Sequence, residues 1–304
     1  MNNISAAATR PTSVFSLSRQ ELALIAVTFV WGGTFLTVHI AMGYAGPLFF
    51  VGLRFVVAGL FALLLCGRRM AGLTRLELGA GAAIGVSIVV GYALQSYGMQ
   101  TITSSKSAFI TAMYVPMVPM VLWLVLRRPP HFMSWIGVAC AFIGLVLLAG
   151  PESGKISLHG GEMATLVGTI AIAAEIILIG HFATRVDSQR VTVVQLLVAG
   201  VVSLLLMPVA GEPLPAFNWV WVACGVGLGL ASALIQLTMN WAQKSVSPTR
   251  ATVIYAGEPV WAGLVGRLAG DRLPALALLG GAFIVIGVIV SEMRPGKAGG
   301  AVKT

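Results

Sequence analysis

Charged residues are scarce in this chain of 304 residues. Only 10% of the side chains are Asp, Glu, Lys or Arg, and 58% are hydrophobic, whereas soluble domains average about 25% charged residues. So few polar side chains cannot cover a globule of this size in water. The composition therefore excludes an ordinary soluble protein and predicts an all-α integral membrane protein.

Cysteines and catalytic motifs are also sparse. Cys66, Cys140 and Cys224 lie far apart in apolar runs and share no CxxC or His-paired spacing, so we expect small core residues, with no disulfide framework and no metal site. The chain has no GxSxG, HExxH or phosphate-loop motif, and no paired carboxylates on one helix face. We therefore expect no cofactor and no enzyme, and a membrane-embedded enzyme stays only as an alternative of another class.

Long apolar runs are what the sequence has in abundance. Residues 1–20 are polar, and the apolar run that follows is too long for a signal peptide, so it predicts a first membrane span. Ten segments reach the ~20 residues that a helix needs to cross the hydrocarbon core. They are Glu21 to Gly43, Pro47 to Cys66, Leu78 to Ser96, Ser104 to Leu126, Phe132 to Gly150, Met163 to His181, Val191 to Ala210, Trp219 to Trp241, Thr249 to Gly266 and Pro274 to Ser291.

The lysines and arginines indicate how these spans are oriented. With ten spans, 14 of the 19 cationic residues lie on the side of the termini, and Lys106, Lys155, Arg267 and Arg272 lie on the other. Because cytoplasmic loops carry the excess of Lys and Arg, this bias predicts cytoplasmic termini. It also accounts for the net charge of +9 without a nucleic-acid partner.

Two halves of the chain resemble each other. Residues 56–65 and 197–206 share six identities in ten at an offset of 141. At an offset of 143, Pro116 meets Pro259 and Gly144 meets Gly287, which sets Glu258 opposite Val115. Because each half holds five spans, an odd number, the halves must cross the membrane in opposite directions. The expected architecture is two inverted-topology repeats, 21–150 and 161–292, between cytoplasmic tails 1–20 and 293–304.

Ordered motifs along the chain resemble a known family. "WGGTF", "PLFFVGLRFVVAG", "SSKSAFITAMYVPMVPM" and "ATVIYAGEPVWAGLVG" follow one another in the first, second, fourth and ninth spans. This order is similar to that of the drug/metabolite transporter superfamily, in particular its EamA-type exporters and, among them, bacterial exporters of aromatic and other amino acids. The resemblance implies a two-half transporter with a central cavity between the first, third, fourth, sixth, eighth and ninth spans. One departure is His39, where the motif usually continues to a lysine.

Prolines and glycines mark the expected bends. Pro116 and Pro119 in the fourth span and Pro259 in the ninth each remove a helical hydrogen bond, so both spans should kink beside a cavity. Passive bending is the alternative. Gly85, Gly91 and Gly229 are candidate hinges, although simple close packing explains them equally well.

Polar and aromatic residues inside spans are the candidates for substrate contact. Amides and hydroxyls can bind the ammonium and carboxylate groups of an amino acid, and aromatic or methionine side chains can form an adaptable wall. Interfacial belting is the alternative for aromatic residues, and we favour it for Tyr97 and Trp241. The candidates are Trp31, Thr34, Tyr92, Gln95, Met99, Tyr114, Glu175, Gln236, Asn240, Tyr255 and Glu258.

Three charged residues fall at depth in the spans. Arg54 is expected to extend toward the outer surface. Glu175 either couples transport to protons or forms a structural pair. Glu258 binds a solute's ammonium group or a proton, or holds backbone groups freed by Pro259.

The sequence as a whole predicts a secondary transporter of the bacterial cytoplasmic membrane. It would export amino acids and related metabolites by alternating access, with a small-molecule substrate and the lipid bilayer as partners and a monomer as the working assumption. An exporter of drugs or other metabolites with the same fold remains open. A passive channel is the alternative of another class.

Overall fold

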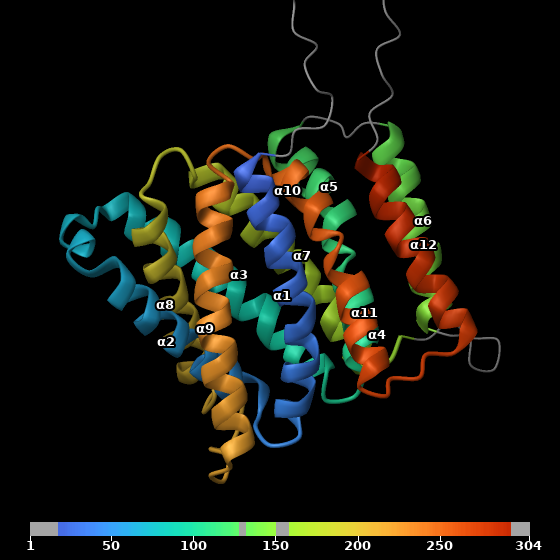
Figure 1. The fold of residues 1–304 in the computed structure, drawn as a ribbon, viewed down its shortest axis with the longest axis horizontal. Helices are drawn as coiled ribbons and strands as arrows, with labels where there is room; N and C mark the ends of the chain where they lie inside the picture. The colour runs from blue at the N-terminus through green and yellow to red at the C-terminus, as the bar shows by residue number, and fades with distance from the viewer. Residues whose placement is uncertain (1–17, 128–131, 150–157, 293–304) are drawn as a thin grey trace, which may run out of the picture.

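The computed structural model describes residues 18–127, 132–149 and 158–292. Within these ranges every regular element is a helix and no strand occurs (Figure 1). Nearly all of the predicted N-terminal tail, the C-terminal tail and residues 150–157 lie outside the described residues. In chain order the elements are α1 Arg19–Met42, α2 Pro47–Cys66, the 3-10 helix η1 Gly67–Gly72, α3 Arg75–Gly98, α4 Ser104–Thr111, α5 Tyr114–Leu126, α6 Phe132–Ala149, α7 Gly160–Phe182, α8 Ser188–Leu206, α9 Trp219–Ala242, α10 Pro248–Tyr255, α11 Glu258–Leu268 and α12 Ala275–Glu292.

Polar caps start the helices at the edges of the apolar runs. Ser18 accepts from the backbone N–H of Glu21, whose side chain accepts in return from the backbone of Ser18, and Thr74 and Glu77 form the same capping box at α3. Such reciprocal bonds satisfy the N–H groups that a helix start leaves free. α1 begins and α12 ends at one face of the bundle (Figure 1), which we call the termini face. The other face, where α1 ends and α12 begins, is the opposite face.

Seven segments of the described chain are long and apolar enough to cross a membrane, so the protein is a multi-pass membrane protein. The other three predicted spans coincide with α6, with α10 plus α11, and with α12. The apolar parts of α6 and α12, Trp135–Leu147 and Leu278–Gly287, are shorter, and α10 with α11 carries three charged residues. The seven segments are Arg19–Met42, Pro47–Gly72, Arg75–Gly98, Ser104–Leu124, Gly160–Phe182, Ser188–Leu206 and Trp219–Ala242.

The fourth and ninth predicted spans are broken, and proline explains where. α4 gives way to α5 at Ala112 and Met113, and α10 gives way to α11 at Ala256 and Gly257. A proline ring clashes with the carbonyl four residues earlier, which is that of Ala112 for Pro116 and that of Tyr255 for Pro259. Pro119 lies inside α5, where the helix continues.

The two breaks correspond to each other at an offset of 144. α4 starts at 104 and α10 at 248, and α5 starts at 114 and α11 at 258. α3 and α9 start at 75 and 219, again 144 apart. Aligning Pro116 with Pro259 gives an offset of 143, which is one residue less than the offset between the helix starts in this region. Glu258 stands opposite Tyr114 rather than Val115.

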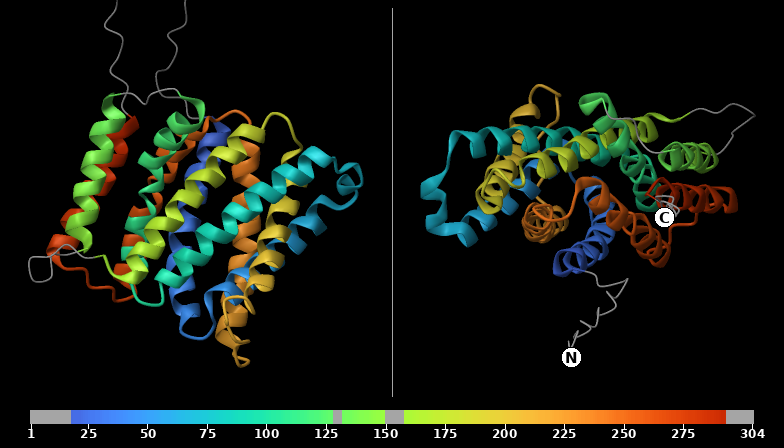
Figure 2. Two further views of the ribbon diagram at one scale, coloured as in Figure 1. Left: turned by 180° about the vertical axis from the view of Figure 1, so that it is seen from behind. Right: turned by 90° about the horizontal axis from the view of Figure 1, so that it is seen from above.

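Close backbone contacts join the helices in reciprocal pairs. α3 packs along α7 and α8, α9 packs along α1 and α2, and α6 lies beside α12 at one edge of the bundle (Figure 2). A Cβ at Gly144 would lie 2.5 Å from the carbonyl oxygen of Gly280, and one at Gly287 would lie 2.6 Å from that of Gly137. Only glycine allows α6 and α12 to approach so closely.

The predicted hinge glycines also lie at helix contacts. A Cβ at Gly85 would come within 2.7 Å of the Gln195 carbonyl on α8, one at Gly229 within 2.6 Å of Val57 on α2, and one at Gly91 within 2.9 Å of Ile172 on α7. These distances explain the three glycines by close packing. Their role as hinges stays a prediction.

Candidate functional site

The two broken helices meet at the buried centre of the bundle. Tyr114, the first residue of α5, donates its hydroxyl to Oε2 of Glu258, the first residue of α11, at 3.0 Å. Neither side chain is more than 1% exposed. Residues that correspond in the two halves of the chain thus bond to each other directly, although they lie 144 residues apart in sequence.

A group of amides holds the second buried carboxylate, Glu175. Gln236 on α9 donates to Oε1 of Glu175 on α7 at 2.7 Å and accepts from Gln195 on α8 at 2.8 Å. Asn240 donates to the side-chain oxygen of Gln195 at 3.3 Å and to the backbone oxygen of Gln236 at 3.0 Å. Each amide has a partner, so the orientation of Glu175 is fixed by three helices.

Arg54 belongs to this centre, which corrects the expectation that it extends to the surface. Its guanidinium lies 5.2 Å from the ring centres of both Phe55 and Tyr92 and donates to Ser232 Oγ at 2.7 Å. It also interacts electrostatically with Glu175. Arg54 is 3% exposed. The two aromatic rings and a carboxylate compensate its positive charge, so the side chain does not need to extend to water.

Aromatic rings surround the charged groups. Trp31 on α1 and Tyr255 on α10 are 5.7 Å apart in a T-shaped pair, and Phe55 and Tyr92 form another at 5.2 Å. The Tyr255 hydroxyl accepts from Gln243 at 3.4 Å. We call this group the central cluster. It comprises Trp31, Arg54, Tyr92, Tyr114, Glu175, Gln195, Gln236, Asn240, Tyr255 and Glu258.

Three predicted site residues lie outside the cluster's bonds. Gln95 donates to Thr111 at 3.0 Å, and the Thr34 hydroxyl donates to the backbone oxygen of Trp31 at 2.7 Å. Met99 caps α3 and contacts the His39 ring through its carbonyl at 3.0 Å. All three are buried, and within the described part of the chain none of their side chains bonds to Glu175 or Glu258.

The central cluster is short of positive charge. It holds two carboxyl groups, Glu175 and Glu258, and one guanidinium, Arg54. Oε2 of Glu175 and Oε1 of Glu258 are buried and have no hydrogen-bond partner among the described residues. A buried ionised carboxylate is stable only when cations or donors compensate it. These two oxygens are therefore available to a proton or to a cationic group of a solute.

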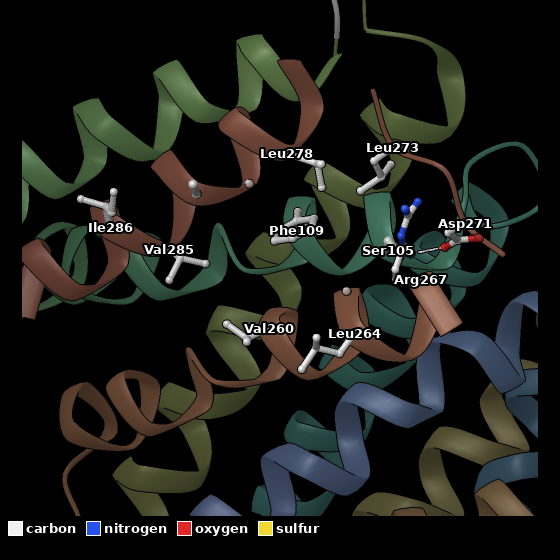
Figure 3. A pocket seen from close by; sticks show the side chains of 13 residues that line it. Ser105, Phe109, Val260, Leu264, Arg267, Asp271, Leu273, Leu278, Val285 and Ile286 are labelled. Carbon is white, nitrogen blue, oxygen red and sulfur yellow. Dashed lines mark hydrogen bonds between the residues drawn. The ribbon is translucent and has the colours of Figure 1, made fainter. Parts of the chain in front are cut away.

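Two cavities lie beside the cluster. One of about 610 Å³ is formed by α4, α11 and α12 (Figure 3), and one of about 430 Å³ by α5, α6 and α7. Pro116 and Met120 line the second, and Val260 and Leu264, 144 residues further on, line the first. Neither cavity is lined by a residue of the central cluster.

An ion pair joins two helices at each face of the bundle. At the termini face Arg250, near the start of α10, pairs with Glu21, near the start of α1. At the opposite face Lys106, near the start of α4, pairs with Glu162, near the start of α7. The lysine and the arginine are 144 residues apart, so the two pairs occupy corresponding positions in the two halves.

The sequence analysis did not single out Gln195, and it predicted a surface position for Arg54. Both are polar residues inside apolar runs, and such residues normally face the interior of a membrane protein. Applying that rule to the second and seventh spans identifies them. Ser232, which accepts from Arg54, has no comparable signal because serine also occurs at ordinary helix contacts.

Comparisons with known proteins agree with this architecture. A family model, EamA-like transporter family, matches residues 19–150 and 159–293. A solved crystal structure superposes with a TM-score of 0.66 at 18% identity, covering 91% of this chain and 96% of the other, which shows a shared fold.

Curated relatives are also transporters by name. An uncharacterized transporter of Archaeoglobus fulgidus is 27% identical over 90% of this chain and 86% of its own. The uncharacterized inner membrane transporter YedA of Escherichia coli strain K12 is 28% identical over 88% and 89%. A Chlamydia trachomatis protein named S-adenosylmethionine/S-adenosylhomocysteine transporter is 28% identical over 88% of both chains. Because the family model spans nearly the whole chain, the protein belongs to the EamA-like transporter family and is a membrane transporter.

Proposed function

We propose that the protein is a secondary transporter that exports amino acids and related small metabolites across a bacterial cytoplasmic membrane by alternating access. The observation that carries the proposal is the bond between Tyr114 and Glu258. It joins corresponding positions of two broken helices beside carboxylate oxygens that have no partner within the described chain. Broken helices near the bilayer midplane are typical of transporter binding sites.

The proposed architecture has ten spans in two inverted repeats with cytoplasmic termini. The corresponding breaks, the reciprocal contacts of α6 with α12 and the two segments matched by the family model support it. So do the ion pairs, since corresponding residues bond at opposite faces. In an inverted repeat, a device that closes one side of the membrane recurs on the other side.

The corresponding ion pairs suggest how access alternates. Glu21–Arg250 and Lys106–Glu162 are both formed in this structure, and neither the cavity of about 610 Å³ nor that of about 430 Å³ is lined by a residue of the central cluster. Breaking the first pair would open α1 from α10 at the termini face. Breaking the second would open α4 from α7 at the opposite face. Transport requires that the two pairs break in turn, since breaking both together would form a channel.

The central cluster fits a zwitterion. The partnerless oxygens of Glu175 and Glu258 can accept from an ammonium group, and Arg54 can donate to a carboxylate. Trp31, Tyr92 and Tyr255 supply apolar walls for the side chain of the solute. The same groups disfavour simple anions, because two carboxyl groups face one guanidinium.

A second candidate substrate class is a cationic amino acid derivative such as a sulfonium. The relative named as an S-adenosylmethionine/S-adenosylhomocysteine transporter motivates it, and the excess of one carboxyl group over cations in the cluster favours it. Aromatic rings stabilise onium ions through their negative faces. The two classes differ in the charge of the solute, and one assay that offers both classes separates them.

The test is transport by the purified protein in liposomes. Neutral amino acids, S-adenosylmethionine and a cationic dye are offered separately, with and without a pH gradient, and uptake is measured with counterflow. The proposal predicts saturable uptake and counterflow for at least one of the first two. Glu258→Gln should reduce uptake, while Arg185→Gln, an exposed cation at the termini face, should not.

Each alternative has its own outcome in that assay. Uptake of the dye alone would assign the protein to drug export. Flux that does not saturate would indicate a channel, and chemical conversion of the solute an enzyme; either of these would refute alternating-access export.

A further inference from the structure

One of the cavities is a groove on the outside of the bundle. It runs between α11 and α12, with Phe109 of α4 as its floor (Figure 3), and measures about 610 Å³. Val260, Leu264, Leu278 and Ile286 along its sides are each about half exposed, between 43% and 56%. The groove therefore opens sideways, toward the lipid that surrounds a membrane protein.

One end of this groove is polar. Arg267 and Asp271 lie together with Ser105 at that end, and Val285 and Ile286 lie at the other (Figure 3). Arg267 is the last residue but one of α11, which ends at the opposite face. The groove is thus apolar at depth in the membrane and polar at its surface.

Asp271, the acidic residue at the polar end, already has hydrogen-bond donors. Oδ2 of Asp271 accepts from the hydroxyls of Ser104 and Ser105 at 3.0 and 2.7 Å, and from the Ser105 backbone at 3.2 Å. These donors belong to the first turn of α4, where a helix favours an anion. Asp271 is therefore not needed as a counter-ion for Arg267.

Two arginines stand at the mouth of the groove. A second cavity, of about 420 Å³, is lined by Arg267, Gly270 and Arg272 and adjoins the groove at Arg267. Both arginines are exposed. Within the part of the chain that the structure describes, neither forms an ion pair.

We propose that the groove and its two arginines form a binding site for one anionic phospholipid of the leaflet at the opposite face. An acyl chain would lie along Val260, Leu264 and Leu278. The headgroup phosphate would bind Arg267 and Arg272, since the planar guanidinium presents paired donors that match phosphate oxygens. The site does not depend on which solute the protein transports.

The chain contains an internal comparison for this proposal. The corresponding cavity of the first half, between α5, α6 and α7, is lined by Met113, Met117, Met120 and Trp123, with no charged residue among its described lining. Trp123 corresponds to Arg267 at the offset of 144. That cavity can take an acyl chain, but its described lining offers a phosphate no cation. Headgroup selectivity should therefore come from the α11–α12 groove alone.

Binding can be measured in detergent by native mass spectrometry, with dioleoyl phosphatidylglycerol and dioleoyl phosphatidylcholine added in turn. We expect the wild type to retain one phosphatidylglycerol more tightly than any phosphatidylcholine. At about fivefold for each arginine, Arg267→Gln with Arg272→Gln should weaken that binding about 25-fold. Arg68→Gln with Arg185→Gln removes the same charge at the termini face and should change nothing.

A second variant tests the groove itself. The nearest atoms to a Cβ at Gly263 belong to the Phe109 ring at 3.4 Å, so Gly263→Leu fills the groove while both arginines remain. It should weaken phosphatidylglycerol binding, whereas Gly227→Leu, at a site with nothing within 4 Å, should not. Thermal unfolding without added lipid confirms that the variants are folded.

Three results would overturn the proposal. They are equal retention of the two lipids by the wild type, unchanged phosphatidylglycerol binding by the double arginine variant, and wild-type binding by Gly263→Leu.

Discussion

We predict that removing either of the two corresponding ion pairs favours opening of the protein at the face where that pair lies. Arg250→Gln removes the pair at the termini face, and Lys106→Gln removes the pair at the opposite face. If each pair closes its own face, the first substitution shifts the protein toward opening at the termini face and the second toward opening at the other. If the substitutions only made the protein less rigid, they would not favour opening at one face over the other.

The magnitudes differ because the pairs are buried to different degrees. Arg250 is 66% exposed in its pair, so losing it should shift the equilibrium by about 0.5–1 kcal/mol, or two- to fivefold. Lys106 is 20% exposed and Glu162 is fully buried. Removing the lysine strands a buried carboxylate, for which about 3 kcal/mol or more is typical, on the order of 100-fold.

Cysteines two residues after Lys106 and Arg250 can report which face opens. Ala108 on α4 and Thr252 on α10 are buried and correspond at the offset of 144. In a background lacking the three native cysteines, each is replaced singly by cysteine, and the rate of modification by a membrane-impermeant thiol reagent is measured. Arg250→Gln should accelerate labelling at 252 and slow it at 108, and Lys106→Gln should do the reverse, with the larger change.

The reasoning fails if both substitutions accelerate labelling at both positions, or if neither changes either rate. The double variant Lys106→Gln with Glu162→Gln is the control, because it removes the stranded carboxylate together with its partner. Its labelling should lie nearer to the wild type than that of Lys106→Gln.

Three further predictions concern the centre and the packing. Glu175→Gln and Glu258→Gln should each change the pH profile of uptake if the corresponding carboxylate exchanges a proton or an ammonium group, and unchanged profiles would leave both residues structural. Arg54→Met should lower the thermal midpoint and abolish uptake. Arg54→Lys should not restore uptake, because a compact ammonium lacks the planar guanidinium that meets both rings while it donates to Ser232. Gly144→Ala, whose Cβ would lie 2.5 Å from a carbonyl oxygen, should destabilise by about 1–3 kcal/mol in thermal unfolding, whereas Gly227→Ala, in open space, should not.

Much of the architecture was predictable because apolar length and proline have local causes. The runs of about 20 residues correspond to helices, and the clash of each proline with the carbonyl four residues earlier puts the breaks just ahead of Pro116 and Pro259. The exact correspondence was not predictable from these prolines. They occupy different positions in their half-helices, third in α5 and second in α11, so aligning them misplaces the register by one residue.

The central cluster was only partly predictable, because its members come together through tertiary packing. Glu175, Gln236, Asn240, Tyr114 and Glu258 could be singled out as polar or aromatic residues within spans. Which side chains bond to each other could not be predicted, since Gln236 reaches Glu175 across 61 residues and Arg54 reaches Ser232 across 178. Position near a span end also misled the interpretation of Arg54, whose direction depends on the aromatic rings that it meets.

The register at the breaks changes the meaning of the glutamate beside Pro259. Glu258 has a counterpart, Tyr114, and the two are hydrogen-bond partners, so the halves contribute an acceptor and a donor at one point. A pair of glutamates there would have left two carboxylates facing each other. The asymmetry therefore allows corresponding helix ends to bond at the centre, and it leaves Oε1 of Glu258 for a ligand. Tyr114→Phe should then weaken substrate binding without removing the carboxylate, because it releases the second oxygen from its only described partner, and a variant with wild-type affinity would show that this bond does not orient Glu258.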